Sequence, residues 1–515
     1  MNDHTHARLI CIRNALLPDA NYLLGRRVDI VIEQGKIAAV EPPNRLLAEH
    51  GNTVDASNFA VIPGLINAHT HAHGTLMKGV AGQWTLEHLL NAASWTGGGR
   101  SAGHHRLAAK VAAAEMIAKG CTAAYDMFAE YPVPTRAAIH EAAMGYRDAG
   151  FRAIVAPMMA DRSFYDLLPE LRAALPPELV EAVDRVKFAP HEQSLAVCAG
   201  LATDWPYAKD GVQFGLAPTI PLHCSDAFIR GCAVLAEQHG LLVQMHVAES
   251  RLQATLGRER YGTTLAGHLE KMGLLSDRFT AAHGVWLEPD DHARLARAGA
   301  SIAHNPGSNL RLGSGIGAMR AWLDAGVNVG IGTDGTTSSD NLNMFEAMRI
   351  AAYVSRVRGE PDSRWIDAQT AFDAATVGGA RAIGMHGKLG KIEVGYEADL
   401  VLLDLKATHY VPRNHLLHQI VYAEDGTGVD SVMIGGRWVY RGRKHLTIDM
   451  DALAAEAEAA VQTIRAAIAP LKARADMLEP FVAKFTDGIR ARFCAAGCGH
   501  QTTMVGAGQP PSAKP

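Results

Sequence analysis

The sequence has no long hydrophobic run and almost no net charge. No uninterrupted apolar stretch reaches 18 residues, so we expect no membrane-spanning helix. A formal net charge of −4 over 515 residues leaves no basic surface of the kind that nucleic-acid binding needs. Residues 1–6 lack a charged segment followed by an apolar one, so no secretory signal is expected. From these absences we expect a cytoplasmic protein that binds neither membranes nor nucleic acid.

Cysteine is scarce, and its placement does not indicate disulfides. The seven cysteines are odd in number and irregular in spacing, which is typical of reduced thiols in the cytoplasm. Cys494 and Cys498 stand near His500 and form a weak metal-binding pattern. The surrounding tail is rich in Gly and Pro, so we expect a disordered, dispensable segment over 493–515. The other cysteines are Cys11, Cys121, Cys198, Cys224 and Cys232.

The chain has the length of one large barrel plus a smaller domain. Its composition, 48% hydrophobic and 20% charged, is that of a globular protein. Short strand-like runs occupy residues 1–60 and again 391–450, and neither set is long enough for its own core. We therefore predict one small composite β domain, a β-sandwich, built from both segments. Residues 451–492, rich in Ala, Glu, Leu and Arg, predict a C-terminal helical segment.

Residues 61–390 alternate apolar strand-like runs with helical patterns such as 105–118, 226–239 and 289–298. Eight such units predict an α/β fold, the (β/α)₈ TIM barrel, whose active site lies at the carboxyl ends of the strands. The eight strands are expected to begin with the run from Val61 and to continue at 122–128, 152–159, 212–221, 241–249, 279–287, 301–309 and 327–335.

Polar side chains of metal-binding type close several of these strands. His69 and His71 end the first strand and, two residues apart, point to the same face. His-x-His alone is weak evidence, because two such histidines often lie on a surface or loop. Further groups end three more strands: His246 and Glu249 the fifth, His283 the sixth, Asp334 the eighth. All lie at one predicted rim, and imidazoles with carboxylates are ligands of zinc and similar ions.

At this point the sequence resembles the amidohydrolase superfamily, in its cytosine deaminase-like branch. It is most similar to the S-adenosylhomocysteine/methylthioadenosine deaminase and triazine hydrolase group. The resemblance covers about residues 7 to 450. It rests on Pro63-Gly-Leu-Ile-Asn-Ala-His-Thr-His71, Met245-His-Val-Ala-Glu249, His304-Asn-Pro-Gly-Ser-Asn-Leu-Arg-Leu312 and Gly332-Thr-Asp334.

The resemblance implies that His69, His71, His246 and Asp334 bind one divalent metal ion. Zinc is favoured, and Fe, Mn and Co remain open. Two-metal relatives have a lysine on the fourth strand, and residues 212–221 contain none. The metal is expected to supply hydroxide by lowering the pKa of a bound water. Asp334 would accept the proton from the water. Glu249 would transfer protons to the substrate, and His283 would polarise it or serve as a fifth ligand.

The substrate is less specified than the metal. Trp84 is expected to contact it on the loop after the first strand, although a buried aromatic at a helix start is an equal alternative. His304 and Asn305 are expected to line the pocket, or to form a structural turn before Pro306. His73 adds an unusual polar group, and the glycine-rich segment 94–101 is interpreted as a mobile active-site loop that lacks the P-loop pattern.

The sequence therefore predicts a metal-dependent hydrolase that releases ammonia or an amine from an sp² carbon. Our first interpretation is hydrolytic deamination of an N-heterocycle of purine, pyrimidine or triazine type. The alternative is hydrolysis of an amide, carbamate or phenylurea C–N bond at the same site. A non-catalytic metal-binding protein is disfavoured because Glu249 and Asp334 are both present. The small-molecule substrate is the expected partner, together with further copies of the chain in a homo-oligomer of two or more subunits.

Overall fold

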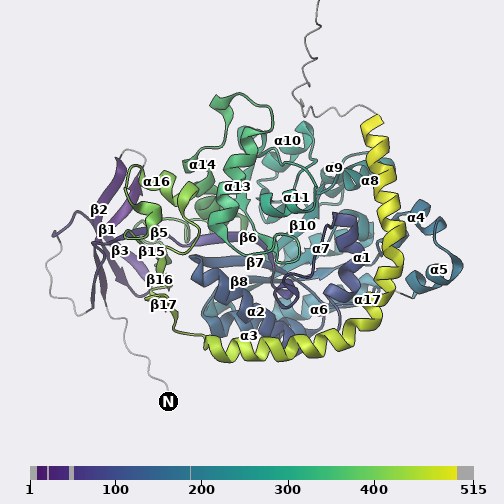
Figure 1. Cartoon of the computed structure of the whole chain (residues 1–515), viewed down its shortest axis with the longest axis horizontal. Coiled ribbons are helices and arrows are strands. Elements are labelled where there is room, and N and C mark those ends of the chain that lie inside the picture. The colour runs from purple at the N-terminus through teal and green to yellow at the C-terminus, as the bar shows by residue number, and fades with distance from the viewer. Residues whose placement is uncertain (1–8, 20–21, 46–51, 186, 496–515) are drawn as a thin grey trace, which may run out of the picture.

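Two sheets and one long helix organise the molecule (Figure 1). The structure is a computed structural model that describes residues 9–19, 22–45, 52–185 and 187–495 of the chain. One sheet lies at the left end in Figure 1, and a curled sheet surrounded by helices fills the middle. The helix α17 (Met450–Ala495) runs below the curled sheet and then turns upward beside α1 (Leu86–Thr96).

The small sheet combines strands from both ends of the chain. Its strands are ordered β18-β17-β16-β15-β5-β1-β2-β3, with β4 beside β1. The two ends meet where β15 pairs antiparallel with β5, Leu400 opposite Pro63. All nine strands belong to one hydrogen-bonded sheet, so the two-layered sandwich stays a prediction. The strands are β1 (Ile10–Asp19), β2 (Tyr22–Glu33), β3 (Lys36–Glu41), β4 (Thr53–Asp55), β5 (Phe59–Pro63), β15 (Leu400–Asp404), β16 (Val429–Ile434), β17 (Arg437–Arg441) and β18 (Lys444–His445).

The curled sheet is parallel and runs in chain order, which confirms the α/β class. Its order is β13-β12-β11-β10-β9-β8-β7-β6-β14. Strand β13 bonds to β12, whereas β14, which starts three residues after β13 ends, bonds to β6. The two edges of the sheet are thereby brought together. Its strands are β6 (Leu65–His71), β7 (Cys121–Ala129), β8 (Arg152–Met159), β9 (Val212–Pro218), β10 (Leu242–Val247), β11 (Phe279–His283), β12 (Ser301–His304), β13 (Asn328–Ile331) and β14 (Asp334–Gly335).

The strand predicted to begin at Val61 was wrong in one respect, because that apolar run is divided between the two sheets. Val61 belongs to β5 of the small sheet, and the curled sheet begins only with Leu65 in β6. The chain changes sheets at Gly64, where an added Cβ would lie 2.1 Å from Thr122 Oγ1. Only glycine fits this crossing, and an apolar run alone does not reveal which of two sheets buries it.

We therefore expect Gly64→Ala to destabilise the protein by about 1–3 kcal/mol, the range found when a packed interior is overfilled. The clash is with a side chain that is itself fully buried, so neither partner can move into solvent. Urea unfolding followed by circular dichroism measures the change. Gly82→Ala is the matched control, because nothing lies within 4 Å of its added Cβ. Equal midpoints for the two variants would contradict the packing argument.

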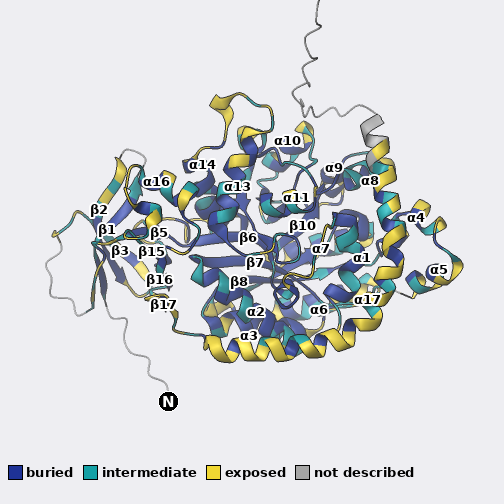
Figure 2. Cartoon of the chain, in the orientation of Figure 1, coloured by how far each residue is buried: buried dark blue, intermediate teal, exposed yellow. Residues whose placement is uncertain are grey.

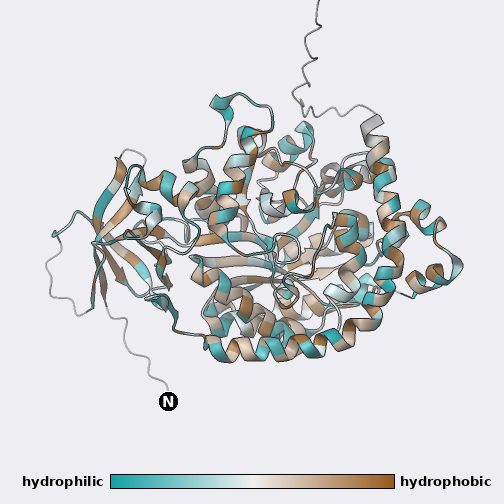
Figure 3. Ribbon diagram, viewed as in Figure 1, coloured by the Kyte–Doolittle hydropathy of each residue, from teal (hydrophilic) through white to brown (hydrophobic). Residues whose placement is uncertain are grey.

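Helices cover the outside of the curled sheet, and their burial is one-sided (Figure 2). The central strands are buried, whereas α17 exposes one face along its length. The same helix alternates hydrophilic and hydrophobic residues in Figure 3. Besides α1 and α17 the helices are α2 (Ala102–Ala118), α3 (Arg136–Ala149), α4 (Pro169–Ala173), α5 (Pro177–Asp184), α6 (His191–Asp204), α7 (Asp226–His239), α8 (Arg251–Tyr261), α9 (Leu265–Lys271), α10 (Pro289–Arg297), α11 (Pro306–Arg311), α12 (Met319–Asp324), α13 (Met344–Arg356), α14 (Ala368–Asp373), α15 (Gly379–Ala382) and α16 (Leu416–His418).

The C-terminal segment predicted at 451–492 is a single helix of 46 residues with Pro470 and Pro480 inside it. Its inner face buries Leu478 and Val482 against Phe164 and neighbouring apolar residues. Within the described part of the chain, no helix is both long and apolar enough to cross a membrane. The predicted tail lies almost wholly outside the described residues, as do Cys498 and His500.

Candidate metal centre

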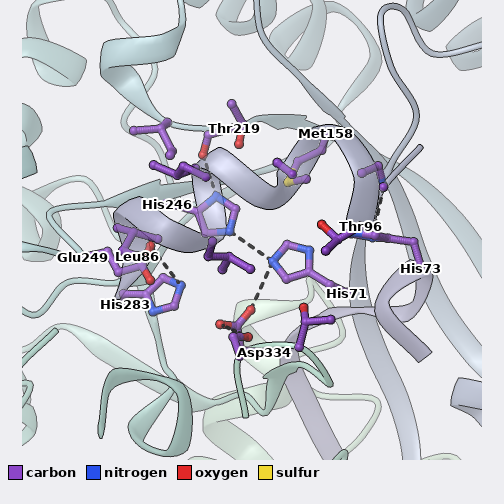
Figure 4. Close-up of a pocket in the computed structure, with 18 of the residues that line it drawn as sticks. His71, His73, Leu86, Thr96, Met158, Thr219, His246, Glu249, His283 and Asp334 are labelled. Carbon is purple, nitrogen blue, oxygen red and sulfur yellow. Dashed lines mark hydrogen bonds and ion pairs between the residues drawn. The ribbon is translucent and has the colours of Figure 1, made fainter. Parts of the chain in front are cut away.

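A small cavity opens at the carboxyl ends of the curled sheet (Figure 4). Its volume is about 100 Å³, and His71, His246, Glu249, His283 and Asp334 line it. These residues come from β6, the end of β10, β11 and β14, as the strand-end argument predicted. His69 lies beside them with its ring centroid 4.8 Å from that of His71.

The ring nitrogens of this group converge on one point. His71 Nε2 lies 3.2 Å from His246 Nε2, and Asp334 Oδ1 lies 3.1 Å from His71 Nε2. The same carboxylate oxygen is 3.3 Å from His69 Nε2. One ring nitrogen from each of His69, His71 and His246 lies within 4.8 Å of the other two. The same distance limit holds for one ring nitrogen each of His69 and His283 and a carboxylate oxygen of Asp334.

The opposite nitrogen of each imidazole is held by an oxygen acceptor. Nδ1 of His69 donates to Gln244 Oε1, Nδ1 of His71 to the carbonyl of Met127, and Nδ1 of His246 to the carbonyl of Thr219, each at 2.6 Å. A carbonyl oxygen only accepts, so Nδ1 carries the proton in all three rings. A ring that is neutral with this tautomer therefore turns a lone pair at Nε2 toward the centre.

This geometry fits a divalent cation. Two Nε2 lone pairs that face each other at 3.2 Å repel unless an electrophile lies between them. His69 Nε2 is completely buried and has no hydrogen-bond partner. Acceptors behind metal-bound imidazoles are the usual way in which proteins fix the tautomer of such ligands. The donor set of three imidazoles and a carboxylate suits zinc and neighbouring transition metals.

Two of the residues have backbone conformations that side chains rarely adopt. His283 has φ 72° and Asp334 has φ 60°, both in the left-handed region. Such conformations cost about 1–3 kcal/mol each for ordinary residues and persist where the surroundings hold them. His283 ends β11 and Asp334 begins the short β14. Because both side chains line the cavity, the strained backbone serves to turn them inward.

The charges of the site are strongly perturbed by burial. Burial opposes charge on Asp334, yet the rings of His69 and His71 beside it hold the pKa of this carboxylate well below its usual range. Burial lowers the pKa of His69 to about 4, so this ring is neutral at pH 7. Burial, together with the negative charge of Asp334, raises the pKa of Glu249 well above its ordinary value. The two carboxylates of the cavity thus favour opposite protonation states, which is typical of acid–base pairs.

Glu249 and His283 lie together on one side of the cavity. Glu249 Oε2 is 3.8 Å from His283 Nε2, and neither side chain is more than 4% exposed. The backbone N–H of Glu249 donates to Gln253 Oε1 at 2.9 Å, which fixes the chain after β10. His283 Nδ1 lies 2.9 Å from Asn309 Oδ1, so its Nε2 faces Glu249 and the metal-type cluster.

The three residues predicted to contact substrate do not line this cavity. Trp84 packs edge-on against Trp95, with ring centroids 5.9 Å apart, and lies in a separate surface pocket beside α17. His304 and Asn305 are buried behind the site at the end of β12, where Asn305 is the N-cap of α11. Trp84 thus fits the alternative of a packed aromatic at a helix start, and His304 and Asn305 fit the alternative of a structural turn before Pro306.

Helix α1 forms an apolar wall of the cavity. Leu86, Leu89, Leu90 and Ala93 line the cavity from one face of this helix. On the other side, Asn91 Nδ2 donates to the carbonyl of Ala475 in α17 at 3.1 Å. The spacing of the four apolar residues matches one helical face, but the same pattern also describes an ordinary buried helix.

The glycine-rich segment has a packing role that the sequence did not reveal. An added Cβ at Gly98 would lie 3.0 Å from Leu471 Cδ1, and one at Gly99 would lie 2.7 Å from Ile468 Cγ2. Gly99 also has φ +67°, which favours glycine. The close approach of α17 therefore explains Gly98 and Gly99. Thr96 and Gly97 line the cavity, and the mobility of the segment stays a prediction.

Several supporting residues were missed from the sequence. Gln244, Thr219 and Asn309 orient the ring nitrogens, and Ser338 Oγ donates to Asp334 Oδ2 at 2.8 Å. Asp126 accepts the N–H of Ala72 directly after His71, at 2.9 Å. Gln244 stands two residues before His246, so strand periodicity places both on one face. No comparable signal points to the carbonyl of Thr219.

A curled parallel sheet with imidazoles and carboxylates at its carboxyl rim is the arrangement found in metal-dependent hydrolases of the α/β class. Residues 60–439 match the amidohydrolase family. The chain belongs to this family, so the predicted resemblance is confirmed.

Similar proteins of known name are deaminases of the branch that the sequence resembles. The chain is 32% identical over 456 residues to a 5-methylthioadenosine/S-adenosylhomocysteine deaminase of Syntrophobacter fumaroxidans, covering 86% of this chain and 95% of the relative. It is 32% identical over 419 residues to a 5'-deoxyadenosine deaminase of Methanothermobacter thermautotrophicus, with coverages of 81% and 90%.

Solved structures agree with the fold. An adenosine deaminase of Xanthomonas campestris with bound zinc superposes with a TM-score of 0.77 at 29% identity, covering 89% of this chain and 98% of that one. An atrazine chlorohydrolase of Arthrobacter aurescens complexed with zinc gives a TM-score of 0.76 at 24% identity, with coverages of 88% and 100%. The second likeness concerns the fold alone.

Proposed function

We propose that the protein is a metal-dependent aminohydrolase that removes ammonia from an aminated N-heterocycle, with adenine-type nucleosides as the first substrates to test. The observation that carries this is the pairing of a buried, metal-fitting cluster with Glu249, a neighbouring carboxyl group whose pKa burial raises well above its ordinary value. The names of the relatives support the substrate class.

In this proposal His69, His71, His246 and Asp334 hold one divalent ion, with zinc favoured. When bound, the ion supplies Lewis acidity that makes water a nucleophile at neutral pH. Asp334 accepts the proton that the attacking water loses, because the neighbouring His69 and His71 lower its pKa and favour its ionised form before the reaction. His283 positions the carbon under attack, and a role as fifth ligand is the alternative.

Glu249 supplies the protons on the substrate side. It donates its proton to the ring nitrogen as the water oxygen bonds to the adjacent carbon. The ionised Glu249 then takes the hydroxyl proton of the adduct as the C=O bond forms and passes it to the exocyclic amine, so that the C–N bond breaks and neutral ammonia leaves. The water proton held by Asp334 finally restores Glu249. The apolar face of α1, with Leu86 and Leu89, contacts the ring and excludes bulk water from the reacting atoms.

The test is a product assay on the metal-loaded protein. Adenosine, 5-methylthioadenosine, aminopyrimidines, aminotriazines, anilides and phenylureas are compared by ammonia release and mass change. We expect ammonia and a product one mass unit heavier from at least one adenine-type nucleoside. Release of an amine with an acid or carbon dioxide from an anilide or urea, without ammonia from the heterocycles, would replace this proposal by amide or urea hydrolysis.

We also predict one metal equivalent per chain. No lysine is among the cavity-lining residues of the described chain, so the bridging group of two-metal sites has no counterpart there. Metal analysis of the purified protein by plasma mass spectrometry measures the stoichiometry. Stepwise removal by chelator should abolish activity in parallel with the loss of a single equivalent. Activity that falls with each of two equivalents would contradict the mononuclear site.

Three architectural statements belong to the same proposal. Within the predicted domain of residues 61–390, the curled sheet forms a closed (β/α)₈ barrel from Leu65 onward. Segments 1–60 and 391–450, together with the end of β5, form the composite β domain. The helix within 451–492 is a separate C-terminal element. A homo-oligomeric state and a cytoplasmic location also stay predictions, which gel filtration and cell fractionation test.

A further inference from the structure

Arg100 is a half-buried residue whose guanidinium nitrogens Nε and Nη1 are buried, and it lies next to the cavity without being one of its lining residues. The function proposed above does not use it. It follows the three glycines after α1, of which Gly97 lines the cavity together with Thr96. Its Nη2 donates to the carbonyl of His73 at 3.0 Å. His73 itself lines the cavity, so the guanidinium lies directly behind one of its walls.

The rest of the guanidinium has no partner. Nε and Nη1 of Arg100 are both buried without a hydrogen-bond acceptor. Among the described residues, no carboxylate forms an ion pair with it, whereas Arg152, which is also largely buried, pairs with Asp399. Burial lowers its pKa only to about 10, so the side chain remains charged at neutral pH. An unpaired buried cation costs several kcal/mol, which an anion at the same place would offset.

The surroundings offer further donors but no anion. His73 Nδ1 accepts the backbone N–H of Ala129 at 3.2 Å, so in the neutral ring Nε2 carries the proton. His105, only 3% exposed, has a buried Nδ1 without a partner. It is close enough for the charge of Arg100 to act on its ring. An arginine fork beside imidazole donors is suited to a carboxylate or another small anion.

The position of Arg100 is fixed by its neighbours on the chain. The preceding Gly98 and Gly99 lie against Leu471 and Ile468 of α17, with no room for side chains. The following Ser101 is the N-cap of α2, and its N–H donates to His104 Nδ1 at 3.1 Å. The guanidinium is therefore held between two anchored segments, as preorganised recognition requires.

We propose that Arg100 binds an anionic group, a carboxylate or a group of similar charge and size, at the edge of the catalytic cavity. If the group belongs to the substrate, Arg100 selects anionic substrates over neutral ones of the same shape. If it is a free anion, it occupies the same place in the resting enzyme. Only the first case, in which the anionic group belongs to the substrate, rests on the proposed function.

The kinetic test uses two substrates of equal size, adenosine-5'-carboxylic acid and adenosine-5'-carboxamide, on the zinc-loaded protein. The ratio of their kcat/KM values measures selectivity for charge. Arg100→Met should lower the ratio by at least about tenfold, the usual consequence of removing one partner of a buried charge pair. Arg100→Lys, which keeps the charge but not the fork, should retain part of it. Arg106→Met is the control, because Arg106 on α2 is already paired with Asp148.

The binding test needs no turnover. Thermal unfolding of the zinc-loaded protein is followed with increasing sodium formate at constant ionic strength. We expect formate to raise Tm of the wild type and to leave that of Arg100→Met unchanged. Without formate, Arg100→Met should be at least as stable as the wild type, because the substitution removes an unpaired buried charge. A lower Tm for the variant together with an unchanged substrate ratio assigns Arg100 a purely structural role and overturns the proposal.

Together, the kinetic test and the binding test distinguish an anion on the substrate from a free anion. They also show whether the anion site or the proposed deaminase function fails. Formate stabilisation through Arg100 with an unchanged substrate ratio leaves a free-anion site and overturns the substrate assignment. Formate stabilisation in a protein that releases no ammonia from any heterocycle upholds the anion site while the proposed function fails. No stabilisation and no change of ratio overturns the anion site even if deamination is observed.

Discussion

Replacing Glu249 by glutamine should leave the metal content near that of the wild type and reduce turnover by about 10²- to 10⁴-fold, the usual contribution of a general acid–base group. Glutamine keeps the shape of the side chain and can still donate a hydrogen bond, but it cannot transfer a proton. The side chain lies 3.8 Å from His283, on the side of the cavity away from the His71–Asp334 contact (Figure 4). Steady-state ammonia release and metal analysis of the same preparation measure both quantities.

Glu87→Gln is the matched control for this variant. Glu87 is also buried, and its charge contributes to the raised pKa of Glu249, but it does not line the cavity. We expect a rate loss far below that of Glu249→Gln. An equal loss in both variants would mean that the local electrostatic field, and not proton transfer by Glu249, limits the rate. Loss of metal from Glu249→Gln would instead make Glu249 a ligand.

In the metal-free protein, the raised pKa of Glu249 also predicts how the stability difference between wild type and Glu249→Gln changes with pH. The pKa of Glu249 is raised in the folded state, so its contribution to stability is complete below the pKa of the unfolded chain and declines as pH rises toward the folded pKa. At pH 7 the metal-free Glu249→Gln variant should therefore be more stable than the wild type. At about pH 4, near the unfolded pKa of glutamate, the two should converge. Urea unfolding at both pH values in the presence of chelator provides the measurement.

Asp334→Asn should behave differently, because metal occupancy and turnover should fall together. The substitution removes a negative charge that lies within 3.3 Å of two imidazole nitrogens, and an amide is a weaker ligand than a carboxylate. We expect metal affinity to drop by more than about 100-fold, beyond the 10–100-fold typical of supporting residues. Titration with a competing chromophoric chelator measures affinity. Full occupancy with normal turnover would remove Asp334 from the ligand set.

Ser338→Ala provides the graded comparison. Its hydroxyl donates to Asp334 Oδ2 at 2.8 Å and so orients the carboxylate without reaching the centre. A loss of affinity of about 10–100-fold is expected for such a partner. A larger effect for Ser338→Ala than for Asp334→Asn would reverse the assignment of the two residues.

The sequence was most informative where chemistry and strand periodicity coincide. His69, His71, His246, His283 and Asp334 were placed at one rim because each ends an apolar run, and the structure brings their side chains together. Family motifs then narrowed the class of reaction. The alternation of strands and helices was equally readable, because parallel strands are buried on both faces and leave long apolar runs.

Contacts between distant segments were not readable from the sequence. The assignment of Val61 to the small sheet depends on pairing with β15, some 340 residues later along the chain. The position of Trp84 is set by α17, and so is the need for glycine at position 99. Local patterns describe which residues are buried, but not which partner buries them.

Helix α1 has consequences for how this enzyme could be given a new specificity. One face of the helix lines the catalytic cavity, and Asn91 on another face is bonded to both α17 and Tyr165. Substitutions in α17 at Ala475, Leu478 or Val482 should therefore shift α1, and with it the cavity wall, without changing any residue that reacts. Laboratory evolution that spares the cavity and randomises these outer positions should recover variants with altered substrate range and an intact metal centre.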